Sequence, residues 1–188
     1  MKNLRNILFL FLAFLLTGCG AKTPEKLVRS SLEQIKKLDE KTIQNFVSYQ
    51  DLVQNKTRDT DVGEETIEAV RLFFQNFDYS ILSTETNEDT ATVTVEIKNL
   101  DARTLAHDLC LALTKISADP RTEDATTMNS YFTVLRDILK TNTYGESTTT
   151  ASFELLRQSG NWKIQTTEEL KDEIVSGLIT ALKDPYLL

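Results

Sequence analysis

The chain has 188 residues, 40% of them hydrophobic, which is enough for one domain with a buried core. Its 28 acidic and 21 basic residues give a formal net charge of −7. An acidic chain of this kind argues against nucleic acid as a partner and against electrostatic adhesion to anionic lipid.

The N-terminal residues have the order of a bacterial export signal. Lys2 and Arg5 give a positive start, and an uninterrupted apolar run follows over 7–16. Ten residues of helix cover about 15 Å, against about 30 Å for the hydrocarbon core of a bilayer, so the run is too short for a membrane span. The Leu-Thr-Gly-Cys sequence at 16–19 resembles the bacterial lipobox. That resemblance implies a diacylglyceryl group on Cys19 and cleavage just before it.

This reading divides the chain into a cleaved signal peptide (1–18), a lipidated cysteine with a short tether (19–23) and one domain (24–188). Loss of the signal removes two basic residues, which changes the formal charge from −7 to −9. Two acyl chains, palmitate among them, give stable attachment, so we expect the protein at the extracytoplasmic face of the cell membrane. An ordinary secretory signal with an incidental cysteine is the alternative.

The domain begins with helical patterns. Thr23 is a hydroxyl N-cap residue, Pro24 suits the first helical position, and Glu25 places a carboxylate in the first turn. We predict helices over 24–37, 40–46 and 64–77, with a polar loop over 55–63.

The hydrophobic period then changes to two. Val93, Val95 and Ile97 alternate with polar residues, which indicates an antiparallel sheet with one buried and one solvated face. We predict strands over 79–86 and 90–100, joined by a turn at 87–89.

Helices and a second hairpin follow. Asp101 is placed to cap a helix, and Thr166 with Glu169 matches a capping box. We predict helices over 101–117 and 128–141 around a loop at 119–127, then strands near 151–155 and 162–165 around a turn at 158–161, and a last helix over 167–182.

The element order and several short segments resemble small lipoproteins of Gram-positive bacteria whose domain is similar to nuclear transport factor 2 and the cystatins. The resemblance implies an α+β fold in which an antiparallel sheet curls around helices into a cone. In this chain a helical insertion lies between the two hairpins, and a helix ends the domain. The segments that carry the resemblance are 16–19, 77–81, 89–93, 98–101 and 160–164.

Few residues suggest catalytic chemistry. We expect the single histidine, His107, to be solvated on the polar side of its helix, and Cys110 to be a partly buried structural thiol. Tyr79 and Trp162 are the only inward-facing strand residues with a polar tip, and such aromatic residues more often belong to the rim or core. The interior strand positions are otherwise aliphatic or phenylalanine, so we predict that the protein is not an enzyme and has no catalytic residues.

Cofactor and metal motifs are absent from the sequence. The six glycines are scattered, and no CxxC or HExxH spacing occurs, so we expect no cofactor and no metal site. Asp59, Asp61, Glu64 and Glu65 form the densest acidic cluster. They fit a calcium loop poorly and a solvated helix N-terminus well.

The expected function is therefore a membrane-anchored, non-catalytic binding module for a small apolar ligand, an envelope component or a protein partner. A cone-fold enzyme of the isomerase or hydrolase type and a structural accessory subunit of an envelope complex are the alternatives. The last helix carries apolar residues over about half its circumference, more than a surface helix needs. Either it is wedged between two layers of the domain, or Val175 and Ile179 contribute to a contact surface.

Overall fold

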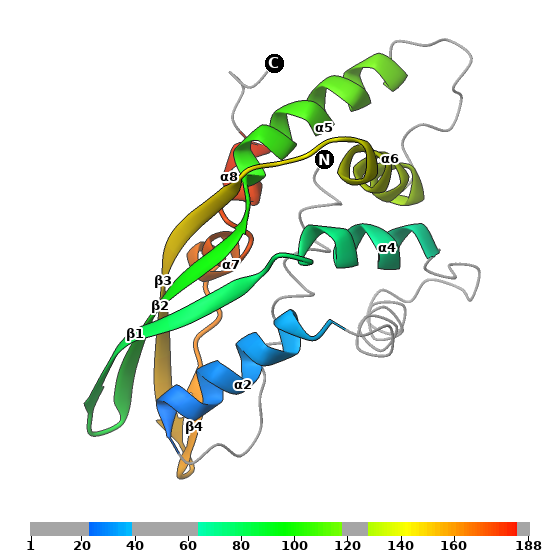
Figure 1. Cartoon of the computed structure of the whole chain (residues 1–188). Coiled ribbons are helices and arrows are strands. Elements are labelled where there is room, and N and C mark those ends of the chain that lie inside the picture. The colour runs from blue at the N-terminus through cyan, green and yellow to red at the C-terminus, as the bar shows by residue number, and fades with distance from the viewer. Residues whose placement is uncertain (1–22, 39–63, 118–127, 184–188) are drawn as a thin grey trace, which may run out of the picture.

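The computed structural model describes residues 23–38, 64–117 and 128–183 (Figure 1). The export signal, Cys19, the helix expected over 40–46 and the loops expected over 55–63 and 119–127 lie outside these ranges.

Four antiparallel strands form one open sheet in the order β1-β2-β3-β4. Both predicted hairpins are confirmed, and each turns through residues with positive φ, namely Glu88 in the first and Ser159 with Gly160 in the second. The strands are β1 (Asp78–Asn87), β2 (Thr90–Leu100), β3 (Glu146–Gln158) and β4 (Asn161–Ile164).

The predicted alternation along β2 sets the inner face of the sheet. Val93 pairs with Phe153 and Val95 with Ala151 in the β2–β3 register, and all four side chains are fully buried. The strand residues between them are polar and more exposed. Burial of the apolar set on one face fixes the register, since a shift by one residue would expose it.

Six helices lie in the described ranges. Thr23 caps the first of them as predicted, its hydroxyl oxygen accepting a hydrogen bond from the Lys26 N–H at 3.4 Å. The helices are α2 (Pro24–Lys36), α4 (Glu64–Phe73), α5 (Ala102–Ser117), α6 (Met128–Thr141), α7 (Glu168–Ile174) and α8 (Leu178–Ala181).

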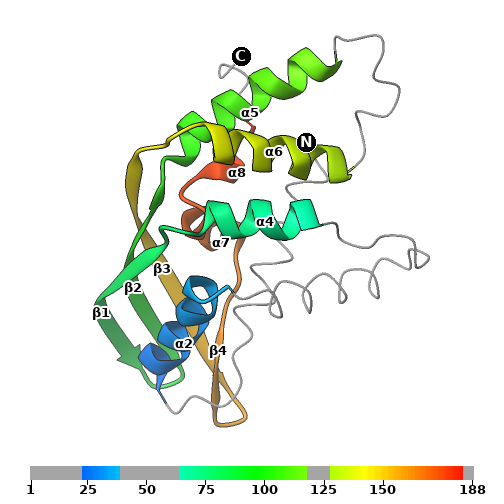
Figure 2. The ribbon, with the colours of Figure 1, turned by 45° about the vertical axis from the view of Figure 1, so that its right-hand side comes forward.

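These helices lie on one side of the sheet in both ribbon views (Figures 1 and 2). Helix α2 packs across β1, β2 and β4, and α7 packs on β3. Helix α4 packs on α6, and α5 contacts both α6 and α8 at the end of the molecule opposite the hairpin turns. The α+β class and the helical insertion between the hairpins are confirmed.

Several helix ends differ from the prediction, α2 and α5 by a single residue each. Helix α4 ends at Phe73, not Phe77, because a turn follows in which the Phe77 N–H donates to the Phe74 carbonyl at 3.0 Å. The cap of α7 is Thr167, whose hydroxyl accepts from the Leu170 N–H at 3.1 Å. The predicted box with Thr166 was therefore wrong by one residue.

The predicted last helix is broken into α7 and α8. Ser176 and Gly177 adopt positive φ values of 55° and 79°, which a right-handed helix cannot contain. The Asp172 carboxylate then accepts from the N–H groups of Ile179 at 2.9 Å and Thr180 at 3.1 Å, and from the Thr180 hydroxyl. A side chain of α7 thus caps the start of α8.

Candidate functional site

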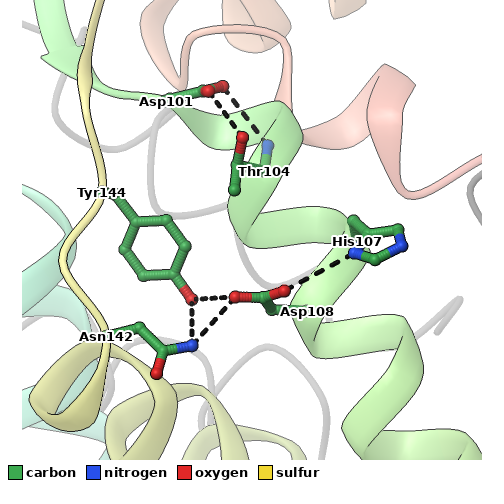
Figure 3. Close-up of polar contacts among 6 residues, drawn as sticks. All are labelled: Asp101, Thr104, His107, Asp108, Asn142 and Tyr144. Carbon is green, nitrogen blue, oxygen red and sulfur yellow. Dashed lines mark hydrogen bonds and ion pairs between the residues drawn. The ribbon is translucent and has the colours of Figure 1, made fainter.

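A polar cluster in the described residues lies where α5, the end of α6 and the start of β3 meet (Figure 3). Asp108 Oδ2 accepts hydrogen bonds from the Tyr144 hydroxyl at 3.0 Å and from Asn142 Nδ2 at 2.9 Å. His107 Nδ1 lies 3.5 Å from the other carboxylate oxygen. We call these four residues the Asp108 cluster.

The position of the Asp108 cluster follows from how α5 begins. Asp101 Oδ1 accepts from the N–H groups of Arg103 and Thr104, and Oδ2 accepts from the Thr104 hydroxyl at 2.6 Å. The Asp101 N–H in turn donates to the Gly145 carbonyl at 2.7 Å, which ties the start of α5 to the residue after Tyr144. Residues seven apart share one face of a helix, so Asp108 lies on the side of α5 that Asp101 anchors.

The surroundings of Tyr144 keep its hydroxyl protonated, so that it donates a hydrogen bond. Burial, together with donation to the Asp108 carboxylate, raises the pKa of Tyr144 to about 12 against the opposing effect of Asn142. The phenol therefore stays protonated at physiological pH and is not a base or a nucleophile. Its role in this geometry is to hold the carboxylate.

His107 is exposed, as predicted, with 47% of its side chain accessible. It is the neighbour of Asp108 in the sequence, and adjacent residues on a helix do not face each other, which explains the long 3.5 Å contact. The Asp108 cluster therefore joins α5 to the segment between α6 and β3.

Cys110 is buried, as the sequence predicted for a structural thiol. Burial raises the pKa of its thiol above the ordinary value, so the reactive thiolate is disfavoured.

The two aromatic candidates belong to the packing of the domain. Trp162 is 7% exposed, and the Arg157 guanidinium lies over its ring at 5.8 Å. Tyr79 is half-buried, and its hydroxyl donates to Glu33 at 2.9 Å, which joins β1 to α2. These contacts assign both residues to the rim and core, the alternative favoured from the sequence.

Val175 and Ile179 are buried in the domain, at 0% and 1% exposure. This arrangement is the wedged one, because α7 packs on β3 while α8 packs on α5. It corrects the expectation that the two side chains contribute to a contact surface, since neither is accessible to a partner in this conformation.

Only two of the four residues of the predicted acidic cluster lie in the described ranges. Glu64 and Glu65 lie in the first turn of α4, and Glu65 Oε1 is 3.6 Å from the Arg136 guanidinium. Asp59 and Asp61 lie outside the described ranges. Within those ranges no group of three or more potential metal ligands comes together.

The interior of the described domain contains three buried polar side chains, Ser31, Thr66 and Asn99. Ser31 donates to the Leu27 carbonyl at 3.1 Å. Asn99, the next-to-last residue of β2, is fully buried, and neither its amide nitrogen nor its amide oxygen has a hydrogen-bond partner. None of the three is ionisable. No helix in the described ranges has both the length and the apolar character needed to cross a bilayer.

The sequence did not predict the Asp108 cluster. Asp108 and Tyr144 are 36 positions apart, so no local pattern connects them. The one available signal was a polar Asn142 and an aromatic Tyr144 just after a predicted helix, at a point where the chain re-enters the sheet.

Comparison with solved structures identifies a similar protein. The crystal structure of YcdA from Bacillus subtilis, described as a candidate lipoprotein, matches 82% of this chain with 13% sequence identity and a TM-score of 0.43. The match covers 47% of that protein, so this chain spans about half its length. No family model and no curated protein matches the chain. Its own residues therefore carry the functional conclusion.

Proposed function

We propose that this chain is a bacterial lipoprotein, anchored through lipid on Cys19 at the extracytoplasmic face of the cell membrane. The observation that carries the proposal is the order of a positive start, ten apolar residues and Leu-Thr-Gly-Cys at 16–19. The N-cap at Thr23 supports it, because the domain begins four residues after the proposed lipid site.

The anchored domain acts as a non-catalytic binding module. Three observations on the described residues support this role: the buried polar side chains are not ionisable, Asp108 Oδ2 accepts from two neutral donors, and burial disfavours the thiolate of Cys110. A cone-fold enzyme would need an acid, a base or a tyrosine directed into its cavity.

A protein partner or envelope component suits the outer face of the sheet, on which no described helix packs (Figures 1 and 2). That face presents the hydroxyl and charged side chains that alternate along each strand with the inward-facing core residues, as in Thr92, Thr94 and Glu96 of β2. We also propose that the domain has the cystatin-like cone fold of the resemblance, and that a small apolar ligand is an alternative to the protein partner. The position of α2 across the inner face of the antiparallel sheet supports the cone fold.

Metabolic labelling with palmitate tests the anchor. The wild-type chain should incorporate label, and Cys19→Ser should not. The matched control is Cys110→Ser, which removes the other cysteine of the chain and should leave labelling unchanged. Equal labelling of the wild type and Cys19→Ser would refute lipidation at Cys19.

Mass spectrometry of the detergent-extracted native lipoprotein tests the binding role. A stoichiometric apolar molecule would identify a ligand carrier, and a stoichiometric protein would identify an envelope complex. Recovery of the chain with neither, together with turnover of a small molecule by the purified protein, would contradict the non-catalytic assignment.

A further inference from the structure

Helix α2 points its N-terminus toward the end of the molecule that carries both hairpin turns (Figures 1 and 2). At its other end, Lys36 Nζ is 2.7 Å from Asp78 Oδ1 at the start of β1. The thirteen residues of α2 cover about 20 Å, and from Lys36 back to Pro24 the helix follows the direction in which β1 runs toward its turn. Pro24 therefore lies toward the turn end.

The tether to the proposed lipid is short. Four residues separate Cys19 from Pro24, and four extended residues reach about 14 Å at most. A lipid on Cys19 therefore holds the start of α2, and with it the end of the sheet that carries the turns, close to the bilayer surface.

The two turns lie side by side and differ in charge. The Arg157 N–H at the end of β3 donates to the Asp89 carbonyl at 2.8 Å. The β1–β2 turn presents the acidic side chains of Glu88 and Asp89, whereas Arg157 and Lys163 flank the β3–β4 turn, and all four are exposed. Anionic headgroups attract the second turn and repel the first within a Debye length of about 8 Å.

The β3–β4 hairpin also presents apolar surface. Leu156 is 37% exposed and pairs in register with Lys163. Behind them Trp162 packs under Arg157. Leu156 and Lys163 therefore place an exposed leucine beside a cation on one face of the hairpin, as in elements that lie at a membrane–water interface, whereas Trp162 is buried on the other face and does not join that surface.

We propose that the β3–β4 hairpin, residues 156–163, contacts the bilayer surface and orients the domain on it, brought there by the lipid on Cys19 and not by the charge of the whole chain, which is negative. The proposal rests on lipidation of Cys19, which brings the hairpin within reach. It places the opposite end, with α5, α6 and the Asp108 cluster, away from the membrane (Figure 1).

Amine labelling of the lipidated protein on vesicles tests this orientation. The chain is reconstituted on vesicles of phosphatidylcholine and phosphatidylglycerol, treated with a membrane-impermeant acylating reagent, and analysed by peptide mass spectrometry. Lys163 should label several-fold more slowly than in the unlipidated Cys19→Ser chain. Lys115, exposed on α5 at the far end, should label equally in both.

Two leucines of similar exposure supply the matched variants. Leu156→Asp adds charge to the hairpin and should restore most of the labelling of Lys163. Leu111→Asp changes a leucine on α5 that is 39% exposed, against 37% for Leu156, and should leave the protection in place.

Co-flotation of the protein with vesicles separates the two proposals. A chain that does not float shows that the lipid anchor has failed, and the orientation fails with it. A chain that floats while Lys163 labels as fast as in Cys19→Ser retains the anchor and overturns the orientation alone. Protection of Lys163 that Leu156→Asp leaves unchanged would also overturn the contact, because it would then not depend on the hairpin.

Discussion

At the scale of single residues, three aspartates determine how helices begin and meet. Asp101 caps α5, Asp172 caps α8, and Asp108 joins α5 to the end of α6 and the start of β3. Each carboxylate accepts several hydrogen bonds, and bonds to an ionised acceptor are stronger than neutral ones. Their removal should therefore cost more than loss of an exposed ion pair.

The first prediction concerns Asp101. Asp101→Ala should lower the free energy of unfolding by about 1 kcal/mol, because two N–H groups of α5 lose their acceptor. The Thr104 hydroxyl and the backbone N–H groups hold the pKa of Asp101 below its usual value. The stabilisation is therefore present above the unfolded pKa of about 3.9 and is lost as the pH falls through the lower folded value.

Urea denaturation at several pH values measures this effect. Asp101→Asn keeps a capping acceptor and should recover most of the loss at neutral pH. A difference between wild type and Asp101→Ala that persists undiminished at a pH well below 3 would contradict the capping role.

The second prediction concerns Tyr144. Tyr144→Phe should lower the free energy of unfolding by about 1 kcal/mol, since Asp108 loses one of its donors. Because the folded pKa is raised to about 12, the contribution is complete below the unfolded value of about 10 and is lost as the pH rises toward 12. Chemical denaturation measures it. Tyr131→Phe, at a half-buried tyrosine of α6, is the control and should have a much smaller effect.

At the scale of elements, hydrophobic period and capping chemistry predicted most helices and strands. The strand 90–100 and the helix 128–141 match the structure to the residue. The break between α7 and α8 was not predicted, because the apolar positions keep a helical period through Ser176 and Gly177. Their positive φ values depend on the Asp172 cap, which acts over seven positions and has no short-range signature.

The third prediction tests that break. Gly177→Ala should destabilise the fold by about 1–2 kcal/mol, because alanine pays for the left-handed conformation at φ 79° although nothing lies within 4 Å of the added Cβ. Gly145→Ala meets equally open space without a positive φ and should be neutral within about 0.5 kcal/mol. Thermal unfolding of both variants gives the comparison. Equal melting temperatures would show that the α7–α8 turn adopts another conformation in solution.

At the scale of the whole molecule, the layers of the fold could be predicted from the sequence better than the contacts between distant segments. Alternation in β2 and amphipathic helices imply a sheet covered on one face, and the structure has this arrangement. Closure of a sheet depends on strand number, twist and pairing, which no local pattern determines. The Asp108 cluster was out of reach for the same reason, since it forms only when α5 packs against the segment after α6. The wedge of the last helices was one of the two arrangements expected from their apolar positions, but the sequence did not decide between them.

The last prediction tests the wedge formed by α7 and α8. Ile179 is 1% exposed in α8, which packs on α5, so Ile179→Ala should lower the free energy of unfolding by about 2–5 kcal/mol through lost burial and a residual cavity. Leu82→Ala is the control, because Leu82 is 56% exposed at the irregularity in β1 and should cost less than about 0.5 kcal/mol. Denaturation and sedimentation are measured on the same samples. A variant that keeps its stability and loses an oligomer would instead place Ile179 in an interface, whereas a destabilised variant with unchanged sedimentation matches the wedge.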